Sequence, residues 1–162
     1  MNQNGPYVSV AAICQSVLHE KDEKISCIRF IDTLNLSVPA DAPDPLPPIK
    51  FGVTAFVAFK SGEFVGTKNC TLRLKSPSGK TGQIEETAPK SYPMLFKGGE
   101  QGHNLIVSLE IPASESGLYW FEVMLDDEIY TRMPLKVNIT RMPPPQPSQM
   151  HSDSQNSPQG EV

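Results

Sequence analysis

Residues 116–128 read Ser-Gly-Leu-Tyr-Trp-Phe-Glu-Val-Met-Leu-Asp-Asp-Glu, and this stretch decides the fold. It predicts a turn, then a strand whose side chains alternate between two faces, then a tight hairpin turn. One face is apolar throughout and the other is mixed. The apolar series is Tyr119, Phe121, Val123 and Leu125, and the mixed series is Trp120, Glu122 and Met124.

The same alternation extends to most of the chain. Short segments of alternating apolar and polar residues are separated by turn signals, and no long helical period occurs. Gly117-Leu118-Tyr119 enters its strand near the end of the chain and resembles the tyrosine corner of immunoglobulin-like sandwiches. The sequence therefore predicts an all-β fold, an antiparallel immunoglobulin-like β-sandwich of about seven or eight strands.

Individual strands follow from the same pattern. Residues 7–18 and 25–31 predict a hairpin closed by a charged turn, and the proline-rich residues 38–48 predict an extended connection between the two sheets. Pro134 places the first part of the last strand at a sheet edge or a bulge. The expected core is Val10, Ile28, Val53, Val57, Leu72, Leu74, Leu105, Val107, Leu109, Tyr119, Phe121, Val123, Leu135 and Val137.

The 162 residues suit one domain with a tail. Residues 1–6 are expected to be a flexible N-terminus, residues 7–140 the β-sandwich domain, and residues 141–162 a Pro/Ser/Gln-rich disordered tail. Within the domain, residues 81–104 have the least regular pattern. A proline run from Pro143 to Pro147 could form a polyproline helix for a partner or a spacer.

Charge and composition exclude some classes of function. The net charge of −4 disfavours a general nucleic-acid binder. No apolar run approaches the ~20 residues that span a bilayer, so no membrane span is predicted. The first residues lack the features of a signal peptide, and Cys14, Cys27 and Cys70 suit buried thiols in a reducing compartment. A cytoplasmic location is the expectation.

The patterns of known catalytic and metal sites are missing. His19, His103 and His151 are scattered, and the cysteines lack zinc-site spacing. No nucleophile elbow occurs, and the glycine-rich residues 97–102 form no phosphate-binding motif. The sequence therefore predicts no catalytic, cofactor-binding or metal-binding residues, no cofactor, and a protein that is not an enzyme.

Two groups of residues leave alternatives open. Asp126 and Asp127 form an acidic hairpin tip, and Asp41 and Asp44 lie in the proline-rich connection. These four carboxylates could hold calcium if one end of the sandwich brought them together, or they could simply favour turns. Trp120 could join Met124 and Phe56 in an exposed apolar patch, or residues 81–104 could cover it.

The layout also resembles an uncharacterised family of small bacterial single-domain proteins. The resemblance rests on a Cys-bearing first strand at residues 12–14, a Pro-rich crossover, Gly-x-Tyr, an acidic hairpin and an Arg-x-Pro-Leu-x-Val strand at residues 132–137. It covers about residues 7–140. It implies an immunoglobulin-like sandwich with no established activity and no functional residues to carry over.

These observations favour a non-enzymatic protein-interaction or accessory module of unknown pathway. The expected partner is a protein of unknown identity, bound through an edge strand, the 81–104 segment or the tail. The alternative is a ligand-binding sandwich that recognises a glycan or an anionic lipid, possibly with calcium. The sequence does not predict an oligomeric state.

Overall fold

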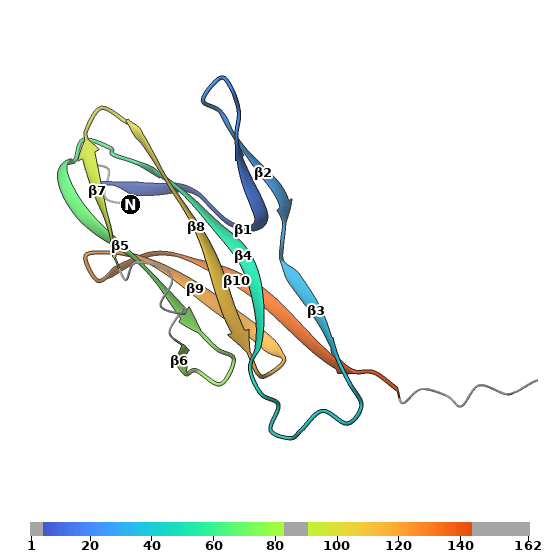
Figure 1. The fold of residues 1–162 in the computed structure, drawn as a ribbon. Helices are drawn as coiled ribbons and strands as arrows, with labels where there is room; N and C mark the ends of the chain where they lie inside the picture. Colours follow the sequence, from blue (N-terminus) through green and yellow to red (C-terminus); the bar gives the residue numbers. More distant parts are fainter. Residues whose placement is uncertain (1–4, 83–90, 144–162) are drawn as a thin grey trace, which may run out of the picture.

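The computed structural model describes residues 5–82 and 91–143, and over these ranges it contains ten strands and no helix (Figure 1). Most of the expected tail and N-terminal segment lies outside the described residues. The strands are β1 (Tyr7–His19), β2 (Ile25–Phe30), β3 (Thr33–Val38), β4 (Ile49–Lys60), β5 (Val65–Lys75), β6 (Thr81–Gly82), β7 (Tyr92–Lys97), β8 (Gly102–Ala113), β9 (Gly117–Leu125) and β10 (Glu128–Arg141).

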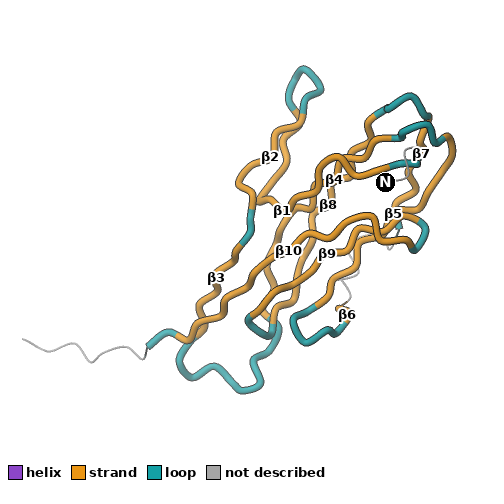
Figure 2. Tube along the Cα trace, turned by 180° about the vertical axis from the view of Figure 1, so that it is seen from behind, coloured by secondary structure: helices purple, strands orange, loops and turns teal. Residues whose placement is uncertain are grey.

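The strands form two packed sheets, so the predicted all-β sandwich is confirmed. Sheet A has the order β2-β1-β4-β8, and sheet B has the order β3-β10-β9-β5-β6, with β7 paired to the first part of β5. Figure 2 shows the two layers from behind. All pairs are antiparallel except β3 with β10, which run parallel.

The core lies between the sheets because alternate side chains of each strand point inward. From β9 these are the four apolar residues that the sequence predicts, and each is at most 1% exposed. The tyrosine corner is present: the Tyr119 hydroxyl donates to the Glu115 carbonyl oxygen at 3.0 Å. This bond ties the turn before β9 to the strand and satisfies the one polar atom that the ring brings inward.

The chain passes from sheet A to sheet B at two adjacent residues between β2 and β3. The Ile31 N–H donates to the Ile13 carbonyl at 2.9 Å, and the Lys136 N–H donates to the Asp32 carbonyl at 2.9 Å. Ile13 lies in sheet A and Lys136 in sheet B, so residues 31 and 32 join the two layers. The proline-rich connection then returns from β3 to β4, as the sequence predicts.

Pro134 lies in the part of β10 that, among the described strands, has no partner on its second side. β3 pairs with β10 only from Lys136 onward, and a register shift follows Ile129. The Lys136 N–H points away from β9, so the nitrogen of Pro134, two residues earlier, faces the same way. Since proline has no N–H, it fits this open edge, and the predicted edge position is confirmed.

The structure has ten strands instead of seven or eight and one parallel pair, and two further features differ from the sequence prediction. Val10 and Ile28 are 47% and 37% exposed instead of buried, because no second sheet covers their strand positions. The segment expected to be irregular contains β7 and the start of β8, although residues 83–90 lie outside the described chain. Met94 and Phe96 of β7 point into the core.

Gly117 offers a test of the turn that precedes β9. Its φ is 144°, and a Cβ there would lie 2.6 Å from Pro77 Cγ. We expect Gly117→Ala to lower the free energy of unfolding by about 1–3 kcal/mol through backbone strain and overlap. Denaturant unfolding measures this change.

Gly52→Ala is the matched control. Gly52 also lies in a strand, but no heavy atom lies within 4 Å of an added Cβ. We expect this variant to be as stable as the parent or slightly more stable. Equal losses from the two substitutions would contradict the assigned backbone constraint at Gly117.

Candidate interaction surfaces

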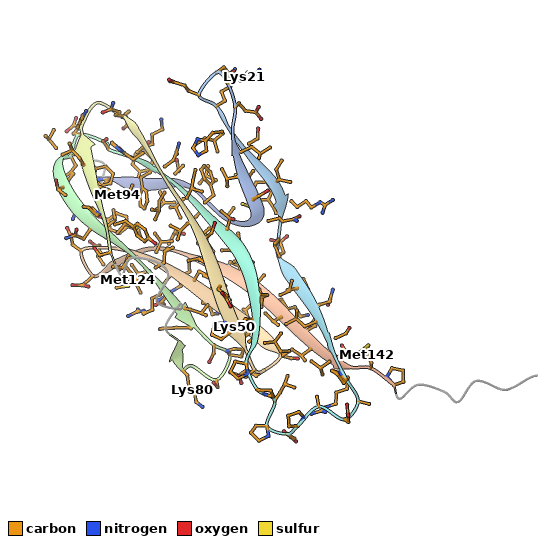
Figure 3. All side chains as sticks on the ribbon, in the orientation of Figure 1. Lys21, Lys50, Lys80, Met94, Met124 and Met142 are labelled. Carbon is orange, nitrogen blue, oxygen red and sulfur yellow. The ribbon has the colours of Figure 1, made fainter. Side chains whose placement is uncertain are left out.

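The β1–β2 hairpin extends beyond the body of the sandwich, with Lys21 near its tip (Figure 3). We call residues 15–30 the arm. β1 pairs with β4 only up to Cys14, so the arm is a ribbon of two strands with no third strand beside it among the described residues. β2 therefore has one open edge along its whole length. A two-stranded ribbon is marginally stable alone, which makes an exposed arm a candidate for contact with another molecule.

One face of the arm carries exposed apolar side chains. The register pairs Ser16 with Ile28 and Leu18 with Ser26, so these four residues share a face. Leu18 is 50% exposed, and Phe30, at the base of β2, is 64% exposed. Exposed large apolar side chains that lie together are a sign of a binding surface.

A second surface lies on the outer face of sheet B, around Glu122 of β9. Glu122 is 1% exposed and faces away from the core. The register sets Arg73 of β5 and Arg132 of β10 beside it. Arg73 Nε donates to Glu122 Oε2 at 2.7 Å and Arg132 Nε donates to Oε1 at 3.1 Å, while Lys75 Nζ lies 3.3 Å from Oε1. We call these four residues the Glu122 cluster.

The Glu122 cluster leaves an excess of positive charge. Burial by itself would raise the pKa of Glu122, but hydrogen bonds from Arg73, Arg132 and Lys75 hold the pKa below its ordinary value. The carboxylate is therefore ionised at neutral pH and balances one of three cations. The side chains of the cations remain 37–54% exposed, so their remaining donors are open to a ligand.

Trp120 is partly exposed beside this cluster. The register sets it between Lys75 of β5 and Pro134 of β10 on the outer face of sheet B. Met124 shares that face but is 8% exposed, whereas Phe56 lies in β4 of sheet A. The alternative in which Trp120, Met124 and Phe56 form one patch is therefore wrong, because Phe56 belongs to the other sheet.

The four aspartates do not meet at one end of the sandwich. Asp126 and Asp127 form the β9–β10 turn, while Asp41 and Asp44 lie in the β3–β4 connection, which Arg141 at the far end of β10 binds through the Ala40 and Pro43 carbonyls. The 14 residues of β10 separate the two sites by about 40 Å. The predicted alternative of a calcium site built from these residues is therefore wrong.

The Asp126 carboxylate is instead part of the hairpin. It accepts a hydrogen bond from the Asn69 N–H at 2.8 Å and another from Lys68 Nζ at 2.9 Å. These two bonds, the first above all, lower the pKa of Asp126. Asp126 and Asp127 both have positive φ, which is the geometry of a tight two-residue hairpin turn. The acidic tip therefore has a structural explanation.

A shallow groove with polar and apolar lining crosses the outer face of sheet A. Its volume is about 520 Å³, and Gly52 forms part of its floor. Lys50 and Glu110 form an ion pair of 3.6 Å at its side, and Figure 3 shows Lys50 at the lower end of β4. The groove also presents the side chains of Gln15, Thr54 and Ser108.

The two described histidines lie in different parts of the fold. His19 is exposed at the arm, His103 packs edge-on against Phe96 with ring centroids 5.1 Å apart, and His151 lies outside the described residues. Over the described ranges, no three His, Cys, Asp or Glu residues group as metal ligands would. No helix in the described chain is long and apolar enough to cross a membrane.

Glu122→Gln tests the electrostatic role of the cluster. The substitution keeps the shape but removes the charge that pairs with three cations, so we expect a loss of about 1–3 kcal/mol in unfolding free energy at pH 7. Because the folded pKa is lowered, this contribution is present above the unfolded pKa of about 4.3 and is lost as pH falls through the folded value. The difference in unfolding free energy between the wild type and the variant should therefore become smaller below about pH 4.

Urea unfolding of both proteins at a series of pH values measures this difference in unfolding free energy. Glu110→Gln is the control, because Glu110 is 46% exposed in its ion pair and should change stability by less than about 0.5 kcal/mol. A gap for Glu122→Gln that stays constant down to pH 3 would contradict the ionised, paired carboxylate.

The three thiols should differ in reactivity. Cys14 and Cys70 are fully buried, and burial raises the pKa of Cys70 to about 12, whereas Cys27 is partly exposed. We expect iodoacetamide at pH 8 to label Cys27 first and the other two only after unfolding, because the thiolate is the reactive form. Peptide mass spectrometry over time gives the order. Labelling of native Cys70 as fast as Cys27 would contradict the described packing.

Comparisons with known proteins agree with the predicted resemblance to an uncharacterised family. The chain is similar to an immunoglobulin-like protein from Pseudomonas aeruginosa, with 15% identity and a TM-score of 0.36 over 85% of this chain and 100% of that chain. It is also similar to a β-glucosidase from Listeria innocua, with 11% identity and a TM-score of 0.37 over 84% of this chain and 17% of that chain. No protein with a curated description matches. The model of a family of unknown function (DUF6941) matches residues 9–138, from β1 to β10, and the chain belongs to that family.

Proposed function

We propose that this protein is a non-enzymatic interaction module that binds a partner protein through the arm. The observation that carries the proposal is the exposed apolar face of the arm, beside the open edge of β2. An extended segment of a partner can add to such an edge through main-chain hydrogen bonds, while alternate side chains of that segment pack on a neighbouring apolar face.

The arm offers both parts of this mode of binding. Leu18 and Ile28 supply apolar contact area on one face, and Phe30 extends it toward the body of the sandwich. Hydrogen bonds within the arm define its shape: the Ser26 hydroxyl donates to Glu20 at 2.8 Å, and Arg29 donates to Gln15 at 3.2 Å. A partner would therefore meet a surface that is already formed, which lowers the entropic cost of binding.

The double variant Ile28→Ser, Phe30→Ser tests the arm. Both side chains are exposed, so stability should change by less than about 1 kcal/mol. We expect the wild-type protein to recover a specific partner from its native cells, and the variant to lose it. With the purified partner, the dissociation constant should rise by tenfold or more, since truncating central apolar residues costs the most at an interface.

Val65→Ser, Leu95→Ser is the matched control, because these residues are 71% and 53% exposed but lie on β5 and β7. It should bind as the wild type does. Hydrogen exchange should show that the partner protects β2 amides. If the arm variant and the control keep equal affinity for the partner, the arm is not the binding surface.

The groove on sheet A favours a second candidate function, the binding of a neutral glycan. Its polar side chains could bind sugar hydroxyls, as in the ligand-binding alternative drawn from the sequence. We expect a glycan that binds the wild type on an array to lose binding to the double variant Gln15→Ala, Ser108→Ala. Binding that is equal in the two proteins would place the glycan elsewhere.

A further inference from the structure

We propose that the outer face of sheet B binds an extended acidic peptide segment of another protein. This surface is separate from the arm, and the inference stands without the function proposed above. Its cations are the three of the Glu122 cluster together with Lys136, which lies further along β10 on the same face. We call this surface, with Trp120, the basic face.

The basic face has an excess of positive charge. Glu122 is the one acidic residue at the outward positions of β5, β9 and residues 132–140 of β10, as the structure describes them. This face therefore carries four cations and one buried anion, although the whole chain has a net charge of −4. A local positive surface on an acidic protein draws an acidic ligand to this face and repels it from the rest.

The cations are also held in place. Arg73 uses Nε and Nη2 on Glu122, and Arg132 uses Nε. An arginine carries five N–H donors in a planar fork. The other donors remain for a carboxylate, which arginine binds in a bidentate manner. Because the buried carboxylate fixes both guanidinium groups, a ligand does not have to order two free side chains.

Spacing favours an extended ligand. Arg73 and Lys75 are two positions apart on β5 and share one face, so they lie about 7 Å apart along the strand. An extended peptide has the same period of two residues, so acidic residues at alternate positions would meet successive cations. Trp120 and Pro134 lie side by side in adjacent strands and form an apolar surface between the cations.

Phosphate polymers fit this face less well. Their affinity depends on many phosphate contacts and on a favourable overall field, whereas this surface has four cations on a chain of net negative charge. A peptide with a few carboxylates needs only the local surface. The proposed occupant is therefore a protein segment with alternating Asp or Glu.

Trp120 provides the measurement, because it is the single tryptophan of the chain and lies on the basic face. The probe is a synthetic decapeptide of alternating Glu and Ala, and its counterpart alternates Gln and Ala. We expect the Glu peptide to change Trp120 fluorescence with saturation, the Gln peptide to leave it unchanged, and added salt to weaken the response.

Variants then locate the contact. Lys75→Gln, Lys136→Gln should raise the dissociation constant of the Glu peptide by about tenfold, and Lys136→Glu should weaken binding without touching the Glu122 cluster. Lys21→Gln removes a charge at the tip of the arm and should leave binding unchanged. Circular dichroism of each variant checks that it is folded.

Three results would overturn the proposal. The first is equal response to the Glu and Gln peptides, and the second is equal binding by Lys136→Glu and the wild type. The third is tighter binding of single-stranded DNA or of phosphatidylserine vesicles than of the Glu peptide, which would assign the basic face to phosphate chemistry. The arm variant should lose the partner protein but still bind the Glu peptide. That result would show that the basic face binds independently of the arm.

Discussion

The arrangement of sheet B depends on β9, which is largely buried on both faces. Its inner face is apolar and packs in the core, but its outer face carries a carboxylate that is almost fully buried. That charge is tolerated because arginines from the two neighbouring strands bind it. A slip of one residue in either neighbour would turn its arginine toward the core, so Glu122 helps to fix the register of three strands.

The two proposed surfaces belong to different layers of the sandwich. The arm continues sheet A, and the basic face is the outside of sheet B. The layers are joined where Ile31 bonds to one sheet and Asp32 to the other. Each surface therefore rests on a separate layer, and one molecule could bind an apolar strand and an acidic segment at the same time without either blocking the other.

Local patterns allowed the sequence to predict the fold, while the surfaces depend on pairing between distant residues. Three local signals are confirmed. They are the alternation around Tyr119, the edge position of Pro134 and the hairpin of residues 7–31. Val10 and Ile28 were expected in the core because an apolar strand residue looks the same whether or not a second sheet covers it. The Glu122 cluster needs the register of three strands, and its one visible signal was a glutamate among apolar residues with arginines in two other strands. The calcium alternative failed because two turns far apart in sequence lie at opposite ends.

The parallel pairing of β3 with β10 has a consequence for how the molecule is made. Asn35 and Asn138, whose side chains are joined by a hydrogen bond, are 103 positions apart in the chain. Contacts over such separations form slowly, since a long loop must close before they contribute stability. During synthesis β3 cannot pair until β10 has emerged, and until then the edge of β3 is open to other chains. β3 is thus a strand that needs protection from premature association while the chain is incomplete.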